Sequence, residues 1–238
     1  MNSIYVAGTD TGVGKTILSL LLMQFFLKGG QEPFYLKPMQ TGCENPRDRN
    51  SDAAFIYGHV KSLGDKDPAE SVIYCFRNPK APYFAARDEG RVIDLKLLKR
   101  VVEEKSRLCS PLIVEAAGGL LVPVTDEALV ADTIAADAKV IIAARAGLGT
   151  INHTLLSIEA LIRRGIRPAG IVFLDPEGTP QGLVSENREA VKRYSGIEVA
   201  GVIGRIADFS SPPLACYHPL ELLFPEVRTR LSCSNLSS

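Results

Sequence analysis

The chain has 238 residues, 46% of them hydrophobic, and its 27 basic and 27 acidic side chains give a formal net charge of zero. This length and composition predict one domain over residues 1–238, and the balanced charge argues against a nucleic-acid partner. The N-terminus lacks a signal-peptide pattern, no apolar helical run is long enough to cross a membrane, and the five widely spaced cysteines are typical of reduced thiols. We therefore expect a cytoplasmic protein with no membrane partner.

Apolar runs of strand length recur along the chain and alternate with helical patterns. The runs are continuously apolar, as expected for strands buried on both faces of a sheet. The predicted strands span residues 3–7, 33–36, 111–116, 139–144, 169–174 and 198–203. The predicted helices span residues 15–28, 94–108, 150–165 and 184–196. This alternation predicts the α/β class, with a doubly wound, mostly parallel sheet flanked by helices.

Two stretches are less regular. Residues 42–93 contain Pro and Gly, which predicts loops and short helices inserted above the sheet. Residues 210–238 are rich in Ser and Pro, which predicts a loosely ordered C-terminal segment. Asp94 and Thr150 are the expected N-caps of their helices.

A glycine-rich turn, "GTDTGVGKT" at residues 8–16, follows the first predicted strand. It ends like a phosphate-binding loop of the P-loop type, but its first glycine stands one residue too early for the standard spacing. Gly12 and Gly14 allow backbone N–H groups to face an anion, and the following helix adds its positive N-terminal dipole. We expect Lys15 to bridge the outer phosphates and Thr16 to ligate Mg²⁺.

The second predicted strand is followed by "KPMQTG". Lys37 stands at the end of the apolar run, so its ammonium is expected at the ligand edge of the sheet, where parallel strands place their sites. A solvated lysine is the alternative interpretation, and the glycine-rich turn nearby favours a second phosphate-binding cation. Thr41 and Gly42 predict a further polar turn.

Carboxylates follow in two places where they could hold a metal. Glu115 ends the strand "PLIVEA", in the position of an acid that holds Mg²⁺ directly or through water. Gly118 and Gly119 offer backbone N–H groups beside it. Asp52 is a third potential magnesium ligand, although the first turn of a helix is an equally good explanation of this residue.

The predicted strand 139–144 is followed by "RAGLGTINHT". Gly149 and Thr150 introduce a second helix N-terminus that suits an anion such as a carboxylate. Simple helix capping explains the same residues equally well.

Taken together, these motifs resemble one family. "GTDTGVGKT", "KPMQTG", "NSDA", "VEAAGG", "VPVTD" and "GTINHT", in this order and at these distances, resemble dethiobiotin synthetase over roughly residues 3–175. The long turn with Thr-Asp-Thr between the glycines is the most specific element. In the related partitioning ATPases a second lysine stands where this chain has Asp10.

The resemblance implies an enzyme of biotin synthesis that depends on ATP and Mg²⁺. It would join 7,8-diaminononanoate and CO₂ through a carbamate and a carbamic–phosphoric anhydride, and close the ureido ring of dethiobiotin. No strong base or covalent nucleophile is needed, because fixed cations bring two mutually repelling anions together.

The resemblance also implies roles for individual residues and a homodimer with its sites at the subunit interface. The catalytic residues would be Lys37, Lys15 and Thr11. The metal ligands would be Thr16, Asp52 and Glu115. The nucleotide would contact Gly12, Val13, Gly14, Lys15, Thr16, Ile17, Asp175 and Asp208. The substrate would contact Lys37, Thr41, Gly118 and, through the other subunit, Gly149, Thr150 and Asn152.

One departure from the family pattern bears on the nucleotide. The family often has Asn-Asp after the strand "AGIVF", where the Asn reads the adenine edge; this chain has Leu174 and Asp175. Leucine makes no such hydrogen bonds, so the choice of base stays open.

Three rival classes share the predicted fold. A switch or partitioning ATPase would need a guanine-reading motif or the second loop lysine, and a cobyrinate-type amidotransferase would normally need a glutaminase domain. A non-catalytic nucleotide-binding module is disfavoured by Glu115, Lys37 and the long turn together.

Overall fold

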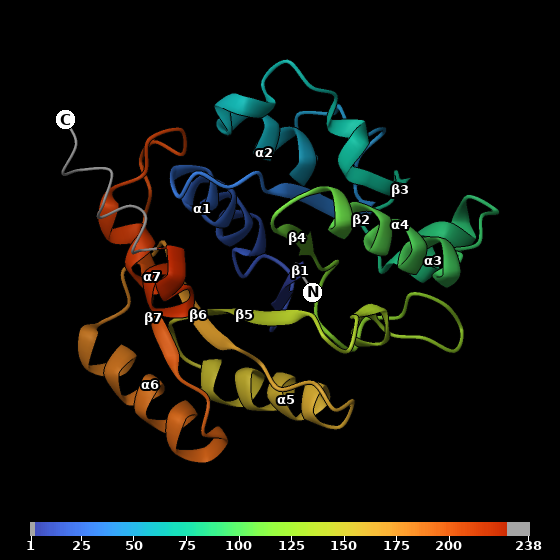
Figure 1. Ribbon diagram of the computed structural model, residues 1–238. Coiled ribbons are helices and arrows are strands. Elements are labelled where there is room, and N and C mark those ends of the chain that lie inside the picture. The colour runs from blue at the N-terminus through green and yellow to red at the C-terminus, as the bar shows by residue number, and fades with distance from the viewer. Residues whose placement is uncertain (1–2, 228–238) are drawn as a thin grey trace.

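The computed structural model describes residues 3–227, and its centre is one seven-stranded parallel sheet (Figure 1). The strands are β1 (Ser3–Gly8), β2 (Phe34–Thr41), β3 (Val72–Phe76), β4 (Leu112–Glu115), β5 (Lys139–Arg145), β6 (Gly170–Asp175) and β7 (Val199–Gly204). They lie in the order β3-β2-β4-β1-β5-β6-β7, and every neighbouring pair is parallel. The predicted α/β fold class is confirmed.

Helices cover both faces of the sheet and bury two separate apolar clusters against it. The helices are α1 (Lys15–Lys28), α2 (Asp52–His59), α3 (Pro82–Asp88), α4 (Leu95–Leu108), α5 (Thr150–Ile162), α6 (Gln181–Ser195) and α7 (His218–Leu223). Residues of α1, α2 and α7 belong to one cluster, and residues of α3, α4, α5 and α6 to the other. Successive residues of a strand serve opposite faces: Ile4 and Val6 join the first cluster, Tyr5 and Ala7 the second.

The strand order changes direction at β1, and this places the site. The chain moves from β1 to β2 on one side of β1, and later crosses from β4 to β5 on its other side. Loops that leave the carboxyl ends of β1, β4 and β5 therefore diverge and leave room for a ligand between them. The glycine-rich turn stands at this point.

The helix predictions hold with small shifts at the ends. Helix α1 spans the predicted residues, and Asp94 caps α4 by accepting hydrogen bonds from the backbone N–H groups of Lys96 and Leu97 at 2.8 and 3.2 Å. The prediction that Thr150 is an N-cap is wrong. Gly149 occupies that position in a left-handed conformation with φ 89°, and Thr150 is the first helical residue and buried.

The predicted irregular region 42–93 contains a strand that the sequence interpretation missed. β3 adds to the edge of the sheet by pairing with β2, from Lys37 opposite Val72 to Thr41 opposite Phe76. Because of this pairing β2 continues to Thr41, well past the predicted end at residue 36. Lys37 is therefore a residue within the strand and not its last residue.

The prediction of a loose C-terminal segment is wrong for the part that the structure describes. Tyr217, Leu220, Phe224 and Val227 are buried, and the rings of Phe26 and Phe224 pack edge-to-face with centroids 4.9 Å apart. The segment covers α1, whose own residues are buried nearly all round. Residues 228–238 of the predicted segment lie outside the described residues.

Candidate active site

The glycine-rich turn positions Lys15 by folding the chain closely around its side chain. The Lys15 ammonium donates a hydrogen bond to the backbone carbonyl of Asp10 at 2.8 Å. A Cβ on Gly8 would lie 2.8 Å from both Cδ and Nζ of Lys15, so the first glycine of the long turn makes the room that Lys15 occupies. Gly14 has φ 92°, and a Cβ there would lie 2.6 Å from Cγ of Leu174. These close approaches explain why glycine is needed at both places.

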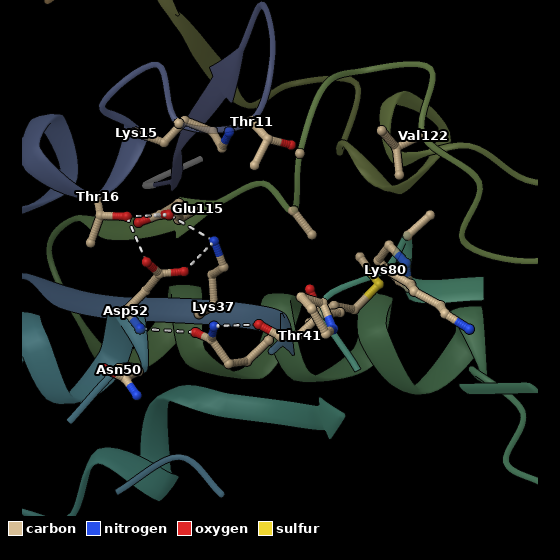
Figure 2. Close-up of a pocket in the computed structure, with 18 of the residues that line it drawn as sticks. Thr11, Lys15, Thr16, Lys37, Thr41, Asn50, Asp52, Lys80, Glu115 and Val122 are labelled. Atoms are coloured by element: carbon tan, nitrogen blue, oxygen red, sulfur yellow. Dashed lines mark hydrogen bonds and ion pairs between the residues drawn. The ribbon is translucent and has the colours of Figure 1, made fainter. Parts of the chain in front are cut away.

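A cavity of about 610 Å³ opens beside the turn and brings together most of the predicted site. Figure 2 shows Lys15 and Thr11 on one side, Thr16, Asp52, Glu115 and Lys37 in the middle, and Thr41 further along. Eleven of the predicted residues line this cavity: Thr11, Gly12, Gly14, Lys15, Thr16, Ile17, Lys37, Thr41, Asp52, Glu115 and Gly118. They come from the turn, α1, β2, the start of α2, and the end of β4 with its following loop.

Lys37 is the electrostatic centre of the cavity. Its ammonium lies 2.7 Å from Glu115 Oε1 and 2.8 Å from Asp52 Oδ2, and donates to the carbonyl of Ala116 at 3.2 Å. Burial alone would lower the pKa of Lys37, but the two carboxylates outweigh it and hold that pKa above its ordinary value. Lys37 and Glu115 are 5% and 1% exposed, so the ion pair lies in a medium where charges act strongly on one another.

Thr16 joins the same group from the first turn of α1. Its hydroxyl oxygen lies 2.8 Å from Asp52 Oδ1 and 2.9 Å from Glu115 Oε1, and its one proton serves one of them at a time. Burial alone would raise the pKa of the Asp52 carboxyl, but the positive charge of Lys37 and hydrogen bonds from Lys37 and Thr16 outweigh it and lower that pKa. Asp52 is thus held as an anion.

The donor set of these three residues fits a magnesium ion. Two carboxylates and one hydroxyl are hard oxygen ligands, and Mg²⁺ usually takes only one or two carboxylates while keeping several waters. Within the described part of the chain, no cluster of three or more His, Cys, Asp or Glu side chains could hold a metal. With their hard oxygen donors, Thr16, Asp52 and Glu115 would suit magnesium better than a softer metal such as zinc.

Among residues 3–227, Lys15 differs from Lys37 in having no carboxylate oxygen within 4.0 Å of its ammonium. Burial, aided by the positive charge of Lys37, lowers the pKa of Lys15 to about 8, against the opposing pull of Glu115, Asp52 and Asp10. An incoming anion would relieve this cost, because it would supply the missing counter-charge. The arrangement suits phosphate binding.

A second cavity, of about 760 Å³, lies on the other side of the turn, beyond the ends of β5, β6 and β7. It shares Gly12, Gly14 and Ile17 with the first cavity and adds Val13 and Asp175 from the predicted nucleotide site. Leu174 and Phe209 contribute apolar surface. The Asp175 carboxylate accepts hydrogen bonds from the backbone N–H of Thr179, at 3.0 and 2.8 Å, and from its hydroxyl at 2.7 Å.

Four predicted residues lie outside both cavities. Asp208 is exposed, and its carboxylate accepts from the backbone N–H of Ser210 at 2.8 Å. Gly149, Thr150 and Asn152 stand at the start of α5, and Asn152 faces solvent. Since their predicted contact is with the substrate in another subunit, a single chain leaves their role a prediction.

Other residues of the site escaped the sequence interpretation. Tyr35 donates its hydroxyl to Glu115 Oε2 at 2.9 Å, and the Gln40 side-chain oxygen accepts from the backbone N–H of Asp52 at 3.0 Å. Lys80 stands at the far wall, in the segment 79–82. Tyr35 lies two residues before Lys37, so the two-residue period of a longer β2 would have placed both side chains on one face.

Comparison with known proteins assigns the chain to a family. A family model described as an AAA domain matches residues 2–213. The ATP-dependent dethiobiotin synthetase BioD of Anaeromyxobacter dehalogenans strain 2CP-C is 42% identical over 76% of this chain and 80% of its own length, and that of Chlorobaculum tepidum is 36% identical over 79% and 81%. The relative from Anaeromyxobacter strain Fw109-5 is 34% identical over 88% and 93%.

Solved structures share the fold at lower identity. The MinD cell division protein of Aquifex aeolicus matches with a TM-score of 0.57 over 98% of this chain and 97% of its own, at 16% identity. A plasmid partition protein of Borrelia burgdorferi bound to AMPPNP matches with a TM-score of 0.57 at 12% identity, over 96% and 98%. These structural similarities show the P-loop fold alone. The sequence identities to the curated relatives show more: the chain belongs to the dethiobiotin synthetase family, ATP-dependent cyclo-ligases of biotin biosynthesis.

Proposed function

We propose that the chain carboxylates and cyclises 7,8-diaminononanoate with CO₂, in a reaction driven by MgATP that yields dethiobiotin, ADP and phosphate. The observation that carries this proposal is the position of Lys37. Its ammonium lies in the same cavity as Lys15 and Thr16 of the phosphate-binding turn, and not on an opposite face of the sheet. Two cations are thus available where two anions must meet.

The reaction begins with the N7 amine, which adds to CO₂ and loses a proton to give a carbamate. The carbamate oxygen attacks the γ-phosphorus, the bond to the ADP oxygen breaks, and a carbamic–phosphoric anhydride forms. The second amine attacks the carbamate carbon, phosphate leaves, and the ring closes with loss of a proton. Each step joins groups of the substrates, so the protein supplies position and charge.

The residues of the first cavity would have different roles, according to where each lies. Lys15 and the hydroxyl of Thr11 would bind the γ-phosphate, while Lys37 and Thr41 would hold the carbamate. Thr16, Asp52 and Glu115 would hold magnesium, which when bound neutralises charge on the outer phosphates. Lys37 stays protonated because its pKa is raised, so it can offer a positive charge to the carbamate at any pH near neutral.

We further propose that the active enzyme is a homodimer in which residues 149–152 of one subunit bind the substrate carboxylate of the other. Two apolar side chains beside this turn support an interface: Leu148 is 94% exposed and Leu156 is 54% exposed. Sedimentation analysis would give twice the monomer mass. Asn152→Ala should raise the KM for the diamino acid while leaving ATP binding unchanged.

Phosphate release tests the proposed reaction. Purified protein should release phosphate from ATP only when the diamino acid and bicarbonate are both present, and a chelator that removes Mg²⁺ should abolish release. Mass spectrometry should detect a product heavier than the diamino acid by CO₂ less one water. Equal hydrolysis of ATP without the diamine would contradict the ligase and favour a switch ATPase.

The switch or partitioning ATPase is the second candidate, favoured only by the fold that the solved structures share. Asp10 stands where such proteins carry their second loop lysine, and its backbone carbonyl accepts from Lys15. Among residues 3–227, none of the helices is long and apolar enough to span a bilayer.

A further inference from the structure

Arg145 is the last residue of β5, and it is exposed although the five residues before it are buried. Strand β5 pairs with β1, and the backbone N–H of Thr9 donates to the carbonyl of Ala143 at 3.1 Å, so the end of β5 lies against the base of the glycine-rich turn. Arg145 therefore leaves the sheet directly beside the phosphate-binding backbone.

The guanidinium lies along the outside of that turn. Its Nη2 donates to the carbonyl of Thr11 at 3.5 Å, and a Cβ placed on Gly12 would lie 3.8 Å from the same nitrogen. Arg145 lines the second cavity, while Lys15 and Lys37 line the first. The turn is thus flanked by positive charge on both sides.

Arg145 also differs from Lys15 and Lys37 in the partners of its charged group. Lys37 is paired with two carboxylates, and the Lys15 ammonium bonds to a backbone carbonyl. Over residues 3–227 no carboxylate oxygen lies within 4.0 Å of the Arg145 guanidinium. Asp175, in the same cavity, directs its carboxylate to Thr179.

The positions of the two cavities indicate which part of a bound nucleotide would lie near the Arg145 guanidinium. A triphosphate bound to the turn with its outer phosphate toward Lys15 would run past Gly12 and Gly14, two of the three residues that the cavities share, and enter the second cavity with its nucleoside. The inner phosphates would then pass the guanidinium. A guanidinium offers several donors in a planar fork that matches phosphate oxygens.

We propose that Arg145 is a nucleotide-binding residue that contacts the inner phosphates from the side of the turn opposite Lys15 and Lys37. The proposal rests on the proposed use of a nucleoside triphosphate, but not on the ring closure. It adds a cation at the end of β5 to those of the turn and β2, and distributes positive charge along the phosphate chain.

The test compares Arg145→Gln with Arg193→Gln, an exposed arginine of α6 that lines neither cavity. Dissociation constants for ATP, ADP, AMP and adenosine are measured by calorimetry at one salt concentration. Arg145→Gln should weaken ATP and ADP about 10-fold or more, as expected for loss of a charged hydrogen bond, and leave adenosine unchanged. Arg193→Gln should change every constant less than about twofold, since an exposed distant charge is screened.

Arg145→Lys serves as the second variant, because it keeps the charge and loses the fork. It should lose less affinity than the Gln variant, and it covers the case in which Arg145→Gln fails to fold. Equal effects of the two Gln substitutions, an equal loss for adenosine, or unchanged ATP affinity in both Arg145 variants would overturn the inference. A protein that binds ATP through Arg145 but makes no dethiobiotin would overturn the proposed reaction alone.

Discussion

The two cavities that flank the glycine-rich turn differ in how their charged groups are arranged. In the first, Lys37, Glu115 and Asp52 form ion pairs in which Lys37 and Glu115 are almost entirely buried. In the second, the guanidinium of Arg145 is exposed and apolar side chains such as Leu174 and Phe209 contribute to the wall. Buried, mutually fixed charges suit chemistry that needs preorganised cations, and the apolar side chains in the wall of the second cavity suit a group that is only held in place.

Removal of the Lys37 ammonium tests the role of the buried charges in the first cavity and should have the largest effect. Lys37→Met should lower turnover by roughly 10²-fold or more, the size expected when one preorganised charge contact is lost. Steady-state dethiobiotin formation measures the effect. Near-normal turnover would remove Lys37 from the mechanism.

Two controls accompany that variant, because it leaves two carboxylates without their partner. ATP binding by the purified variant reports whether the fold and the turn survive. Lys80→Met removes another lysine that lines the first cavity, whose side chain is 52% exposed and already paired with Asp88. It should cost far less than Lys37→Met.

Gly14→Ala tests the contact between the turn and the second cavity. Both Gly14 and Gly30 have positive φ, 92° and 72°, but only Gly14 would push a Cβ against Leu174, whereas nothing lies within 4 Å at Gly30. A left-handed alanine costs about 1–2 kcal/mol, so Gly30→Ala measures that cost alone. Gly14→Ala should lose a further ~1–3 kcal/mol of unfolding free energy through overpacking.

Urea denaturation measures both glycine variants. Equal losses of unfolding free energy in the two variants would mean that Leu174 moves aside for the new methyl group. The close approach of β6 to the turn would then not be the reason for glycine at position 14.

Changing pH sharpens the contrast between Lys15 and Lys37. The pKa of Lys15 is lowered to about 8, so its charged form, which is the form proposed to bind phosphate, is present below that pH and is lost above it. ATP affinity should therefore fall with rising pH above about 8, by at most about tenfold per unit, because binding then requires uptake of one proton. Calorimetric titration between pH 7 and 9.5 measures this.

Lys15→Arg is the matched control for the pH series, since a guanidinium stays charged throughout that range. Its ATP affinity, even if lower, should show no such decline. A flat profile for the unaltered protein would mean that Lys15 keeps its proton in the free enzyme.

A panel of nucleotides is expected to give the smallest effect. Leu174 presents no hydrogen-bond donor or acceptor to a base, and the Asp175 oxygens are engaged by Thr179. The values of kcat/KM for ATP, GTP, CTP and UTP should then lie within about tenfold of one another, the discrimination typical of apolar contacts. A preference for ATP of 10³-fold would show that backbone groups of the second cavity read adenine.

Local patterns made much of this fold predictable. The turn and α1 were located correctly because glycine spacing and a following apolar helix are properties of adjacent residues. Asp94, the N-cap of α4, was predictable for the same reason. β3 was missed because five residues at the edge of a sheet are held by their pairing with β2, which no local pattern records.

The sequence by itself determined which residues are candidates for the chemistry and near which strands they stand: Lys15, Thr16, Lys37 and Glu115 were all singled out from apolar runs and the turns after them. Only the tertiary structure decided that Lys37 pairs with both Glu115 and Asp52, that Tyr35 supports Glu115, and that Arg145 lies on the opposite side of the turn. Those contacts join residues that are 15 to 134 positions apart along the chain. They exist because the strand order brings β2, β4, β1 and β5 together, and burial then makes the charges act on one another strongly.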